Sequence, residues 1–250
     1  MANSFSFNAV DMSDYGLRVN RHTIINYYKE LSTIQLTDRA YKVGAVRPFK
    51  SIELESTIIG TSVADLYSKL DSIKEYLDTG NEEQLILDSL ATRYWNAEFE
   101  SIDGEKVSTT KWQGTLSFIC YDPLAYSTTE TSSDFNVDAD PKTISETVGG
   151  TGMINPIYTL TAGETLTTVT IKLKNINTNE EFQWVGSLAT NDELKIDVEH
   201  WEVEKNGVNA MSGLSLSSQF PRLMPGSNSI TVTGFSTTGA MNITYRDTYL

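Results

Sequence analysis

The sequence predicts a mainly β protein of two domains that carries one α-helix. Short runs in which apolar and polar residues alternate recur along most of the 250 residues. One stretch, about residues 62–79, has helical periodicity instead. A polar, acidic stretch then divides the chain. This predicts an N-terminal domain over residues 1–127, a linker over 128–141 and a C-terminal domain over 142–250.

Alternation predicts the strands of the N-terminal domain. Residues 52–55 alternate between apolar and polar, and so do residues 94–100. Asp103-Gly104 follows the second run, and Asp-Gly between strand-like runs is a good hairpin signal. We therefore expect a hairpin at Asp103-Gly104, with a returning strand from about Lys111 to Tyr121.

The helix of about residues 62–79 has a recognisable start, stripe and end. Ser62 with Asp65 three residues later resembles a capping box. The apolar residues that follow recur at spacings of three, four and seven: Val63, Leu66, Tyr67, Leu70, Ile73 and Leu77. Gly80 lies where a left-handed residue would end the helix. No second helix of this quality is visible, so we expect this helix to lie on a sheet.

The C-terminal domain reads as short strands separated by turns. Asn206-Gly207 is a turn signal between two short strands. The other alternating or β-rich runs are 166–173, 181–185, 194–198, 230–232 and 241–245. Many short strands at regular spacing favour an antiparallel sandwich or jelly roll.

The charge balance argues against binding to nucleic acid. The net charge is −14, and residues 1–127 carry 12 basic and 18 acidic side chains while 128–250 carry 7 and 15. Tight nucleic-acid binding needs clustered Lys and Arg, so we expect no specific nucleic-acid partner. No signal peptide or membrane-length apolar run is visible, which predicts a soluble product of the cytoplasm without membrane insertion. The lone Cys120 excludes an internal disulfide.

The sequence offers no catalytic, cofactor or metal motif. Neither His22 nor His200 lies in a recognisable nucleophile context, and we expect His200 in a strand near a hairpin. The acidic residues Asp134, Asp138 and Asp140 lack calcium-loop spacing. No nucleotide-binding glycine motif is present. We therefore predict no enzyme activity, no cofactor, and no catalytic, cofactor-binding or metal residues.

Two residue classes leave alternatives open. A glycosidase needs two carboxylates across a cleft, and the chain has many candidates: Glu53, Glu55, Glu98, Glu100, Glu180 and Glu181. The pairs 53/55 and 98/100 lie two apart on strands, so each pair shares one face, which we expect to be wet. The aromatic residues of the C-terminal half either form a sugar-binding face or fill the sandwich core, and the core is favoured: Tyr158, Phe182, Trp184, Trp201 and Tyr245.

Four places in the chain resemble one family, the distal tail proteins of long-tailed phages. They are Phe7–Asp11 with Asp14–Val19, Arg93–Ala97, Phe118–Tyr126 and Pro225–Asn228. Many members of the family have glycine at the position of Ala9. The four places follow one another in the family's order and span essentially the whole chain. The chain therefore resembles the siphophage distal tail proteins, which are baseplate hubs.

This resemblance implies a fold and a role. The N-terminal domain would be like a tail-tube subunit, a β-sandwich or barrel with one helix that forms a homo-hexameric ring around the DNA path. The C-terminal domain would be a galectin-like sandwich. The ring would lie at the distal tail tip of the virion and join the tail tube protein to tail-tip, tail-fibre or receptor-binding proteins. The alternatives are a carbohydrate- or receptor-binding module, a tail-tube protein proper and a tail-associated hydrolase.

Overall fold

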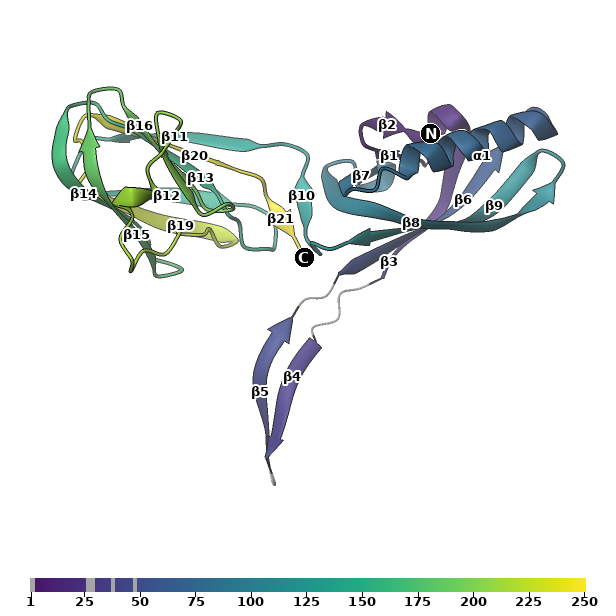
Figure 1. The fold of residues 1–250 in the computed structure, drawn as a ribbon, viewed down its shortest axis with the longest axis horizontal. Helices are drawn as coiled ribbons and strands as arrows, with labels where there is room; N and C mark the ends of the chain where they lie inside the picture. The colour runs from purple at the N-terminus through teal and green to yellow at the C-terminus, as the bar shows by residue number, and fades with distance from the viewer. Residues whose placement is uncertain (1–2, 26–29, 37–38, 47–48) are drawn as a thin grey trace. The chain divides into compact units, whose positions relative to one another are not determined.

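The structure, a computed structural model, describes residues 3–25, 30–36, 39–46 and 49–250. The chain divides into two compact units, Met1–Thr128 and Thr129–Leu250, which we call unit 1 and unit 2. Figure 1 labels their helices and strands.

Unit 1 is a β-sheet that carries one helix on one face. Its main sheet has the strand order β2-β1-β7-β8-β9-β6-β3, with β10 paired to β8, and β4 with β5 forms a separate antiparallel pair. The strands are β1 Phe5–Phe7, β2 Val10–Asp11, β3 Leu17–Ile25, β4 Glu30–Leu36, β5 Arg39–Val46, β6 Lys50–Ile59, β7 Glu83–Leu87, β8 Arg93–Ser108, β9 Lys111–Cys120 and β10 Ala125–Ser127. Short 3-10 turns lie at Met12–Tyr15 and Asp88–Leu90.

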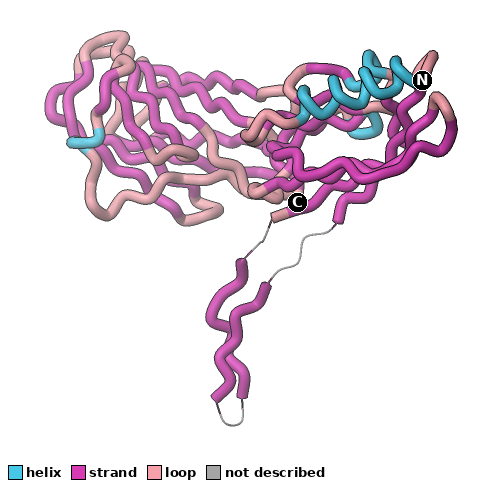
Figure 2. Tube along the Cα trace, turned by 45° about the vertical axis from the view of Figure 1, so that its right-hand side comes forward, coloured by secondary structure: helices cyan, strands magenta, loops and turns pink. Residues whose placement is uncertain are grey.

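The predicted helix is confirmed as α1, Val63–Leu77. Ser62 caps it, because the side chain of Ser62 accepts a hydrogen bond from the backbone N–H of Asp65 at 3.1 Å. The stripe that faces the sheet is buried: Leu66, Leu70, Ile73 and Leu77. Gly80 is left-handed, with φ +66°, two residues beyond the capping Asp78. In Figure 2, α1 is the long helical segment of unit 1.

The sheet under α1 has one buried face, because the strand register places apolar residues of neighbouring strands opposite one another. Ile52 of β6 lies opposite Phe118 of β9, which lies opposite Phe99 of β8. Leu54 and Leu116 form the next buried pair. Alternate residues of these strands therefore point to α1 and to the opposite face.

The predicted hairpin at Asp103-Gly104 is wrong. β8 continues through both residues to Ser108, and the turn lies at residues 109–110. Gly104 pairs with Gly114, and a Cβ on either glycine would lie within 2.5 Å of the Trp112 ring. These glycines therefore make room for an indole that packs over the strands, and the Asp-Gly pair is not a turn here.

The N-terminal segment explains part of the family-like pattern. Asn8 and Ala9 form the turn between β1 and β2 with φ of +47° and +62°. Such backbone favours glycine, which fits the glycine that many family members have where this chain has Ala9. Asp11 then caps the 3-10 turn that follows, and the left-handed Gly16 ends it.

Unit 2 is a sandwich of two antiparallel sheets. Their orders are β11-β20-β13-β16-β17-β18 and β12-β19-β14-β15. The strands are β11 Thr131–Val137, β12 Lys142–Val148, β13 Ile157–Thr161, β14 Leu166–Asn175, β15 Glu180–Leu188, β16 Glu193–Asp197, β17 Glu202–Lys205, β18 Val208–Asn209, β19 Gly226–Thr233, β20 Gly239–Tyr245 and β21 Thr248–Tyr249, with a 3-10 turn at Met211–Gly213. Together with the single helix of unit 1, this confirms the mainly β fold class among the described residues.

The predicted linker over residues 128–141 is wrong in its central part. Residues 131–137 form β11, which pairs with β20 along its whole length, from Thr131 opposite Tyr245 to Val137 opposite Gly239. Val137 is buried in the core of unit 2. The segment is therefore a strand of the sandwich despite its polar composition.

Candidate functional site

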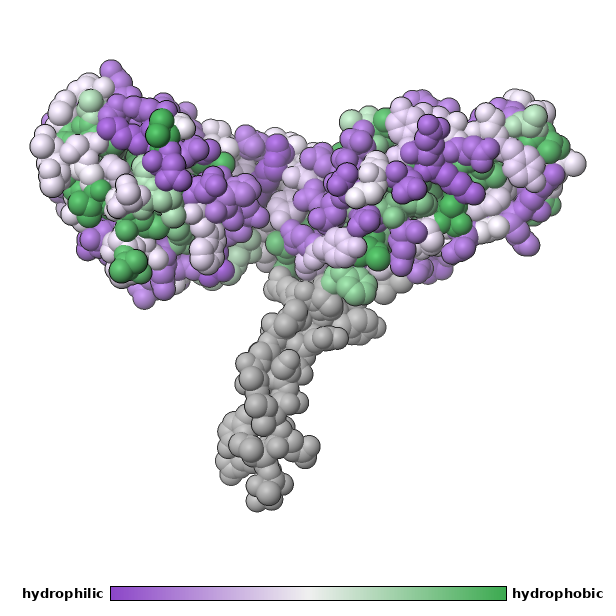
Figure 3. Space-filling view, viewed as in Figure 1, coloured by the Kyte–Doolittle hydropathy of each residue, from purple (hydrophilic) through white to green (hydrophobic). Residues whose placement is uncertain are grey.

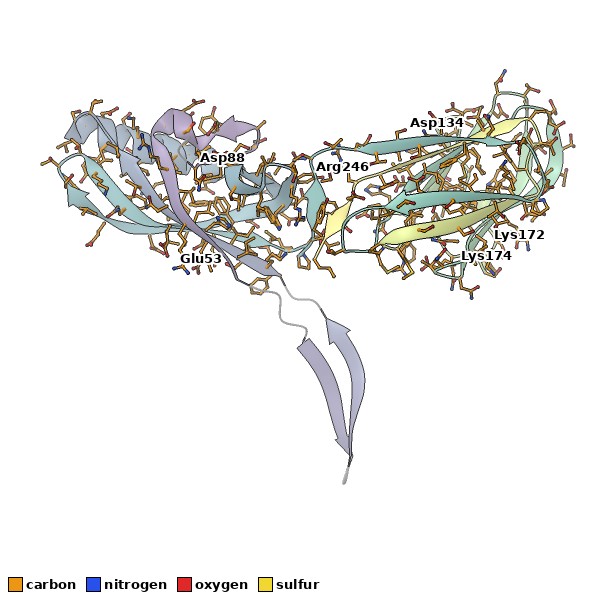
Figure 4. The ribbon with its side chains drawn as sticks, turned by 180° about the vertical axis from the view of Figure 1, so that it is seen from behind. Glu53, Asp88, Asp134, Lys172, Lys174 and Arg246 are labelled. Carbon is orange, nitrogen blue, oxygen red and sulfur yellow. The ribbon has the colours of Figure 1, made fainter. Side chains whose placement is uncertain are left out.

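The face of the unit 1 sheet that points away from α1 is polar, and we call it the polar sheet face. It is formed by alternate residues of β3, β6, β9 and β8, and its register gives rows across the strands. One row runs Thr23, Glu53, Ser117 and Ser101, and the next runs Arg21, Glu55, Thr115 and Asp103. Figure 4 labels Glu53 on this face, on the other side of the sheet from α1.

Short polar side chains and carboxylates alternate on the polar sheet face. Thr57 accepts hydrogen bonds from Asn20 at 2.9 Å and from Gln113 at 3.2 Å, which ties β3, β6 and β9 together. Arg21 approaches Glu55 at 3.9 Å with both side chains more than half exposed. An exposed pair at this distance contributes little stability, so both side chains can still interact with solvent or with a ligand.

The polar sheet face is acidic. Five carboxylates belong to it, against three basic side chains in the same register positions, Arg18, Arg21 and Lys111. The carboxylates are Glu53, Glu55, Glu98, Asp103 and Glu105. A surface of hydroxyls, amides and excess carboxylates repels phosphate at close range and offers a polyanion few cationic groups to bind.

A second surface lies on unit 2, in a groove of about 820 Å³ that we call the Trp201 groove. The residues that matter for its chemistry are Asn155, Glu180, Trp201, Gln219, Phe220 and Arg222. They come from the segment before β13, the start of β15, the turn between β16 and β17, and the segment before β19. The surface of the described residues is otherwise mixed, and Figure 3 shows apolar residues as separate spots on the visible face.

Trp201 is the exposed aromatic residue of this groove. The residue is 70% exposed, whereas Trp95, Trp112 and Trp184 are buried. Its indole stacks on the ring of Phe220, with centroids 6.2 Å apart and planes at 18°. The backbone of Trp201 has φ +58°, a conformation that costs energy for a bulky residue. The turn therefore holds an indole outside the core.

An ion pair beside the indole is fixed by several hydrogen bonds. Arg222 donates to Glu180 from Nε at 2.9 Å, and its backbone N–H donates to the other carboxylate oxygen at 2.8 Å. Burial raises the pKa of Glu180, but the hydrogen bonds from Arg222 outweigh it and hold that pKa below its usual value. Asn155 donates from Nδ2 to Glu199 at 2.6 Å.

The two histidines and the cysteine lie in different elements. His200 lies in the turn between β16 and β17, not in a strand as expected, and its Nδ1 is 3.1 Å from Asp197. This neighbour raises the pKa of His200. His22 lies in β3 in unit 1. Burial raises the pKa of the Cys120 thiol to about 12, which makes it a poor nucleophile.

The acidic residues of the predicted linker each have a separate partner. Asp138 pairs with Lys142 at 2.5 Å, and Asp140 accepts from the backbone of Gly234 at 2.9 Å. Asp134, labelled in Figure 4, accepts from Asn242 at 2.7 Å. Within the described ranges no three His, Cys, Asp or Glu side chains gather as metal ligands, and no helix there has the length and apolar character needed to span a membrane.

Sequence reasoning placed four of the five aromatic residues correctly. Tyr158, Phe182, Trp184 and Tyr245 are buried in unit 2. Trp201 is the exception, and alternation could not reveal it because it lies in a turn beyond the end of β16. The sequence does carry one indication that Trp201 lies outside the core: Trp201 directly precedes the predicted strand that begins at Glu202.

Comparisons with known proteins agree with this fold. Residues 149–249 match the model of a family described as siphovirus-type tail component, C-terminal domain. No curated protein matches the chain. The crystal structure of the Dit protein (gp 19.1) of phage SPP1, described as a paradigm of the hub adsorption apparatus in phages that infect Gram-positive hosts, is similar with a TM-score of 0.83 and 18% identity over 100% of both chains.

A second solved structure is similar at a lower level. A chain of the phage p2 baseplate, in its activated conformation with Sr, has a TM-score of 0.50 and 9% identity over 97% of both chains. At such low identities the TM-scores show similarity of fold, and the family match covers most of unit 2. The chain thus has the fold of the SPP1 Dit protein, and its residues 149–249 match the family model of a siphovirus-type tail component C-terminal domain.

Proposed function

We propose that this chain is the structural hub of a long-tailed phage tail tip, a homo-hexameric ring that joins the tail tube to tail-tip and receptor-binding proteins and lets DNA pass. The observation that carries the proposal is the similarity to the SPP1 hub protein over the full length of both chains. In this role unit 1 forms the ring, and the galectin-like unit 2 lies outside it.

Two features of unit 1 support a ring. The described sheet ends at β3, which pairs with β6 along one edge. On its other edge the backbone N–H of Val19 donates to the carbonyl of Asn3 at 2.9 Å, and the rest of that edge offers backbone groups for a neighbouring subunit. A cyclic ring needs a heterologous interface, in which one edge of each subunit meets a different edge of the next. The polar sheet face is then suited to line the DNA path, because its excess of carboxylates repels phosphate.

The ring gives a first prediction. In solution at rising concentration, the full chain should reach a mass close to six times the 27.8 kDa of one subunit. Light scattering measures this mass, and negative-stain images should show a ring with a central hole. A second sample also contains the purified tail tube protein, which should promote the same ring if the ring is weak without it. A monomer under every condition, or a closed two-fold dimer, would contradict the proposal.

The DNA path gives a second prediction. The double variant Glu53→Lys, Glu55→Lys reverses one half-buried and one exposed charge of the polar sheet face and should bind duplex DNA at least about tenfold more tightly at low salt. The matched control, Glu193→Lys with Glu202→Lys, makes the same change of net charge on exposed residues of unit 2. Filter binding at several salt concentrations measures both. Equal gains in the two variants would mean that the polar sheet face has no special access to DNA.

A further inference from the structure

We propose that the Trp201 groove of unit 2 is a binding site for one or two neutral sugar units of an oligosaccharide. This inference goes beyond the hub role and does not depend on it, because all of the groove's residues belong to unit 2. The indole of Trp201 would stack on the C–H face of a sugar ring, and the polar groups beside it would bind the hydroxyls.

The stacking surface is the first reason. The exposed indole of Trp201 is costly to hydrate. The backbone of Trp201, which positions this indole, is in a strained left-handed conformation. Phe220 stacks almost parallel to the indole and limits how the indole can turn. Unit 2 therefore presents a flat, pre-oriented apolar plate, which loses little entropy when a flat ligand binds.

The polar groups are the second reason. A sugar hydroxyl donates and accepts at once, so its site needs fixed donors and acceptors together. The ion pair of Glu180 and Arg222 supplies both, and the carboxylate is only 14% exposed and held in place. Asn155 uses Nδ2 on Glu199, which leaves its Oδ1 as an acceptor. The side-chain amide of Gln219 is exposed, pairs with no other of the described residues, and offers a donor and an acceptor.

The charge of the groove favours a neutral ligand. Glu180 and Arg222 neutralise each other, while the neighbouring Glu199 is exposed and adds negative charge at the rim. An anionic polymer would be repelled at this rim. The volume of about 820 Å³ lies within the range of small-molecule sites.

The groove is poorly suited to an extended peptide that would add as a strand. β15 is the last strand of its sheet, and the segment that follows the Met211–Gly213 turn covers its outer edge. Ser215 donates its backbone N–H to Gln183 at 2.9 Å, and Gln219 donates to Glu181 at 2.8 Å. A peptide therefore finds no backbone partners at this edge, and recognition has to come from side chains.

The test titrates the full chain with neutral oligosaccharides and follows tryptophan fluorescence, because the other three indoles are buried and Trp201 dominates the change. The probes are lactose, cellobiose, maltose, chitobiose and N-acetyllactosamine, up to about 10 mM, which detects affinities weaker than millimolar. We expect at least one of them to bind. A complete absence of binding, or capture of a peptide in place of every sugar, would overturn the proposal.

Three variants locate the site on the groove. Trp201→Ala should weaken sugar binding at least tenfold, measured by isothermal calorimetry or ligand-observed NMR, and Trp201→Phe should restore part of it. Arg222→Lys should also weaken binding, since lysine lacks the planar fork. The matched control is Tyr121→Ala, an aromatic residue of unit 1 that is 58% exposed, and it should bind like the parent. Binding that survives in Trp201→Ala would overturn the assignment, and a failed hexamer test would leave it unaffected.

Discussion

Phe118→Ala should lower the free energy of unfolding of unit 1 by about 3–5 kcal/mol, which is the range for removing a buried phenylalanine. Phe118 is fully buried and touches three other rings. Its ring centroid lies 5.7 Å from that of Phe5, 5.5 Å from Phe7 and 5.7 Å from Phe99. Because a domain is stable by only about 5–15 kcal/mol, a single change of this size removes a large part of the total.

The reason for the size of this effect is the position of Phe118 between three strands. Phe5 and Phe7 belong to β1, Phe99 to β8 and Phe118 to β9, and β1 reaches β9 only through β7 and β8 in the sheet order. The ring therefore joins β9 to β1, a strand with which β9 does not pair directly. Its removal leaves a cavity that the surrounding strands cannot easily close.

Urea unfolding followed by fluorescence measures this change. A chain of two units is expected to unfold in more than one step, so the step of unit 1 should move to lower urea while that of unit 2 stays in place. The control Tyr121→Ala removes an exposed aromatic residue three positions away and should change stability by no more than about 0.5 kcal/mol. Equal shifts in the two variants would show that the four-ring cluster is not what stabilises unit 1.

Local patterns were sufficient to predict the parts of the fold that local forces determine. Helix α1 has a capping serine and a complete apolar stripe within its own sequence, and both lie as predicted. The strands β6 and β15 have one buried face each, so their alternation was readable. The turn at Asn206-Gly207 also needs only its own two residues, which both have positive φ.

Tertiary contacts decide the parts that the sequence did not reveal. Gly104 is adjacent to an Asp, which favours a turn, but its lack of a side chain serves Trp112, which comes from another strand. β11 hides its strand character because its inward side includes Ser133, which donates to Glu146 of β12 at 3.0 Å. A polar residue that is satisfied by a distant carboxylate looks like a linker residue in the sequence.

The candidate surfaces differ in the same way. The polar sheet face follows from the alternation of β6, and the shared face of Glu53 and Glu55 was predicted. The Trp201 groove combines residues from four separate segments, among them Asn155, Glu180, Trp201 and Arg222. No sequence spacing relates these segments, so only the fold of unit 2 brings them together.

Asn228→Leu should destabilise unit 2 by about 3 kcal/mol or more, because it removes four hydrogen bonds of a fully buried side-chain amide, each worth about 0.5–1.5 kcal/mol. Asn228 is fully buried at the start of β19, in the Pro225–Asn228 stretch of the family-like pattern. Its Nδ2 donates to the carbonyl of Met224 at 2.7 Å and to that of Gly226 at 3.1 Å. Its Oδ1 accepts from the backbone N–H of Met224 at 2.9 Å.

A second buried asparagine extends this network toward the Trp201 groove. Asn175 of β14 donates to Asn228 at 3.1 Å and to the backbone carbonyl of Arg222 at 2.6 Å. The two side chains therefore close the turn before β19 and hold the backbone that carries Arg222. A leucine of similar volume at position 228 fills the space but pairs none of these groups, so packing cannot compensate for the lost hydrogen bonds.

Hydrogen exchange and urea unfolding together test this role of Asn228. In Asn228→Leu the amide of Met224 should exchange much faster, and the unfolding step of unit 2 should move to lower urea while that of unit 1 stays unchanged. The control Ser227→Ala alters an exposed neighbour and should shift stability by no more than about 0.5 kcal/mol. Because the network holds Arg222, the same variant should also weaken sugar binding. Full stability with slow exchange at Met224 would mean that water or a rearranged turn replaces the asparagine, and that Pro225–Asn228 serves some purpose other than closing this turn.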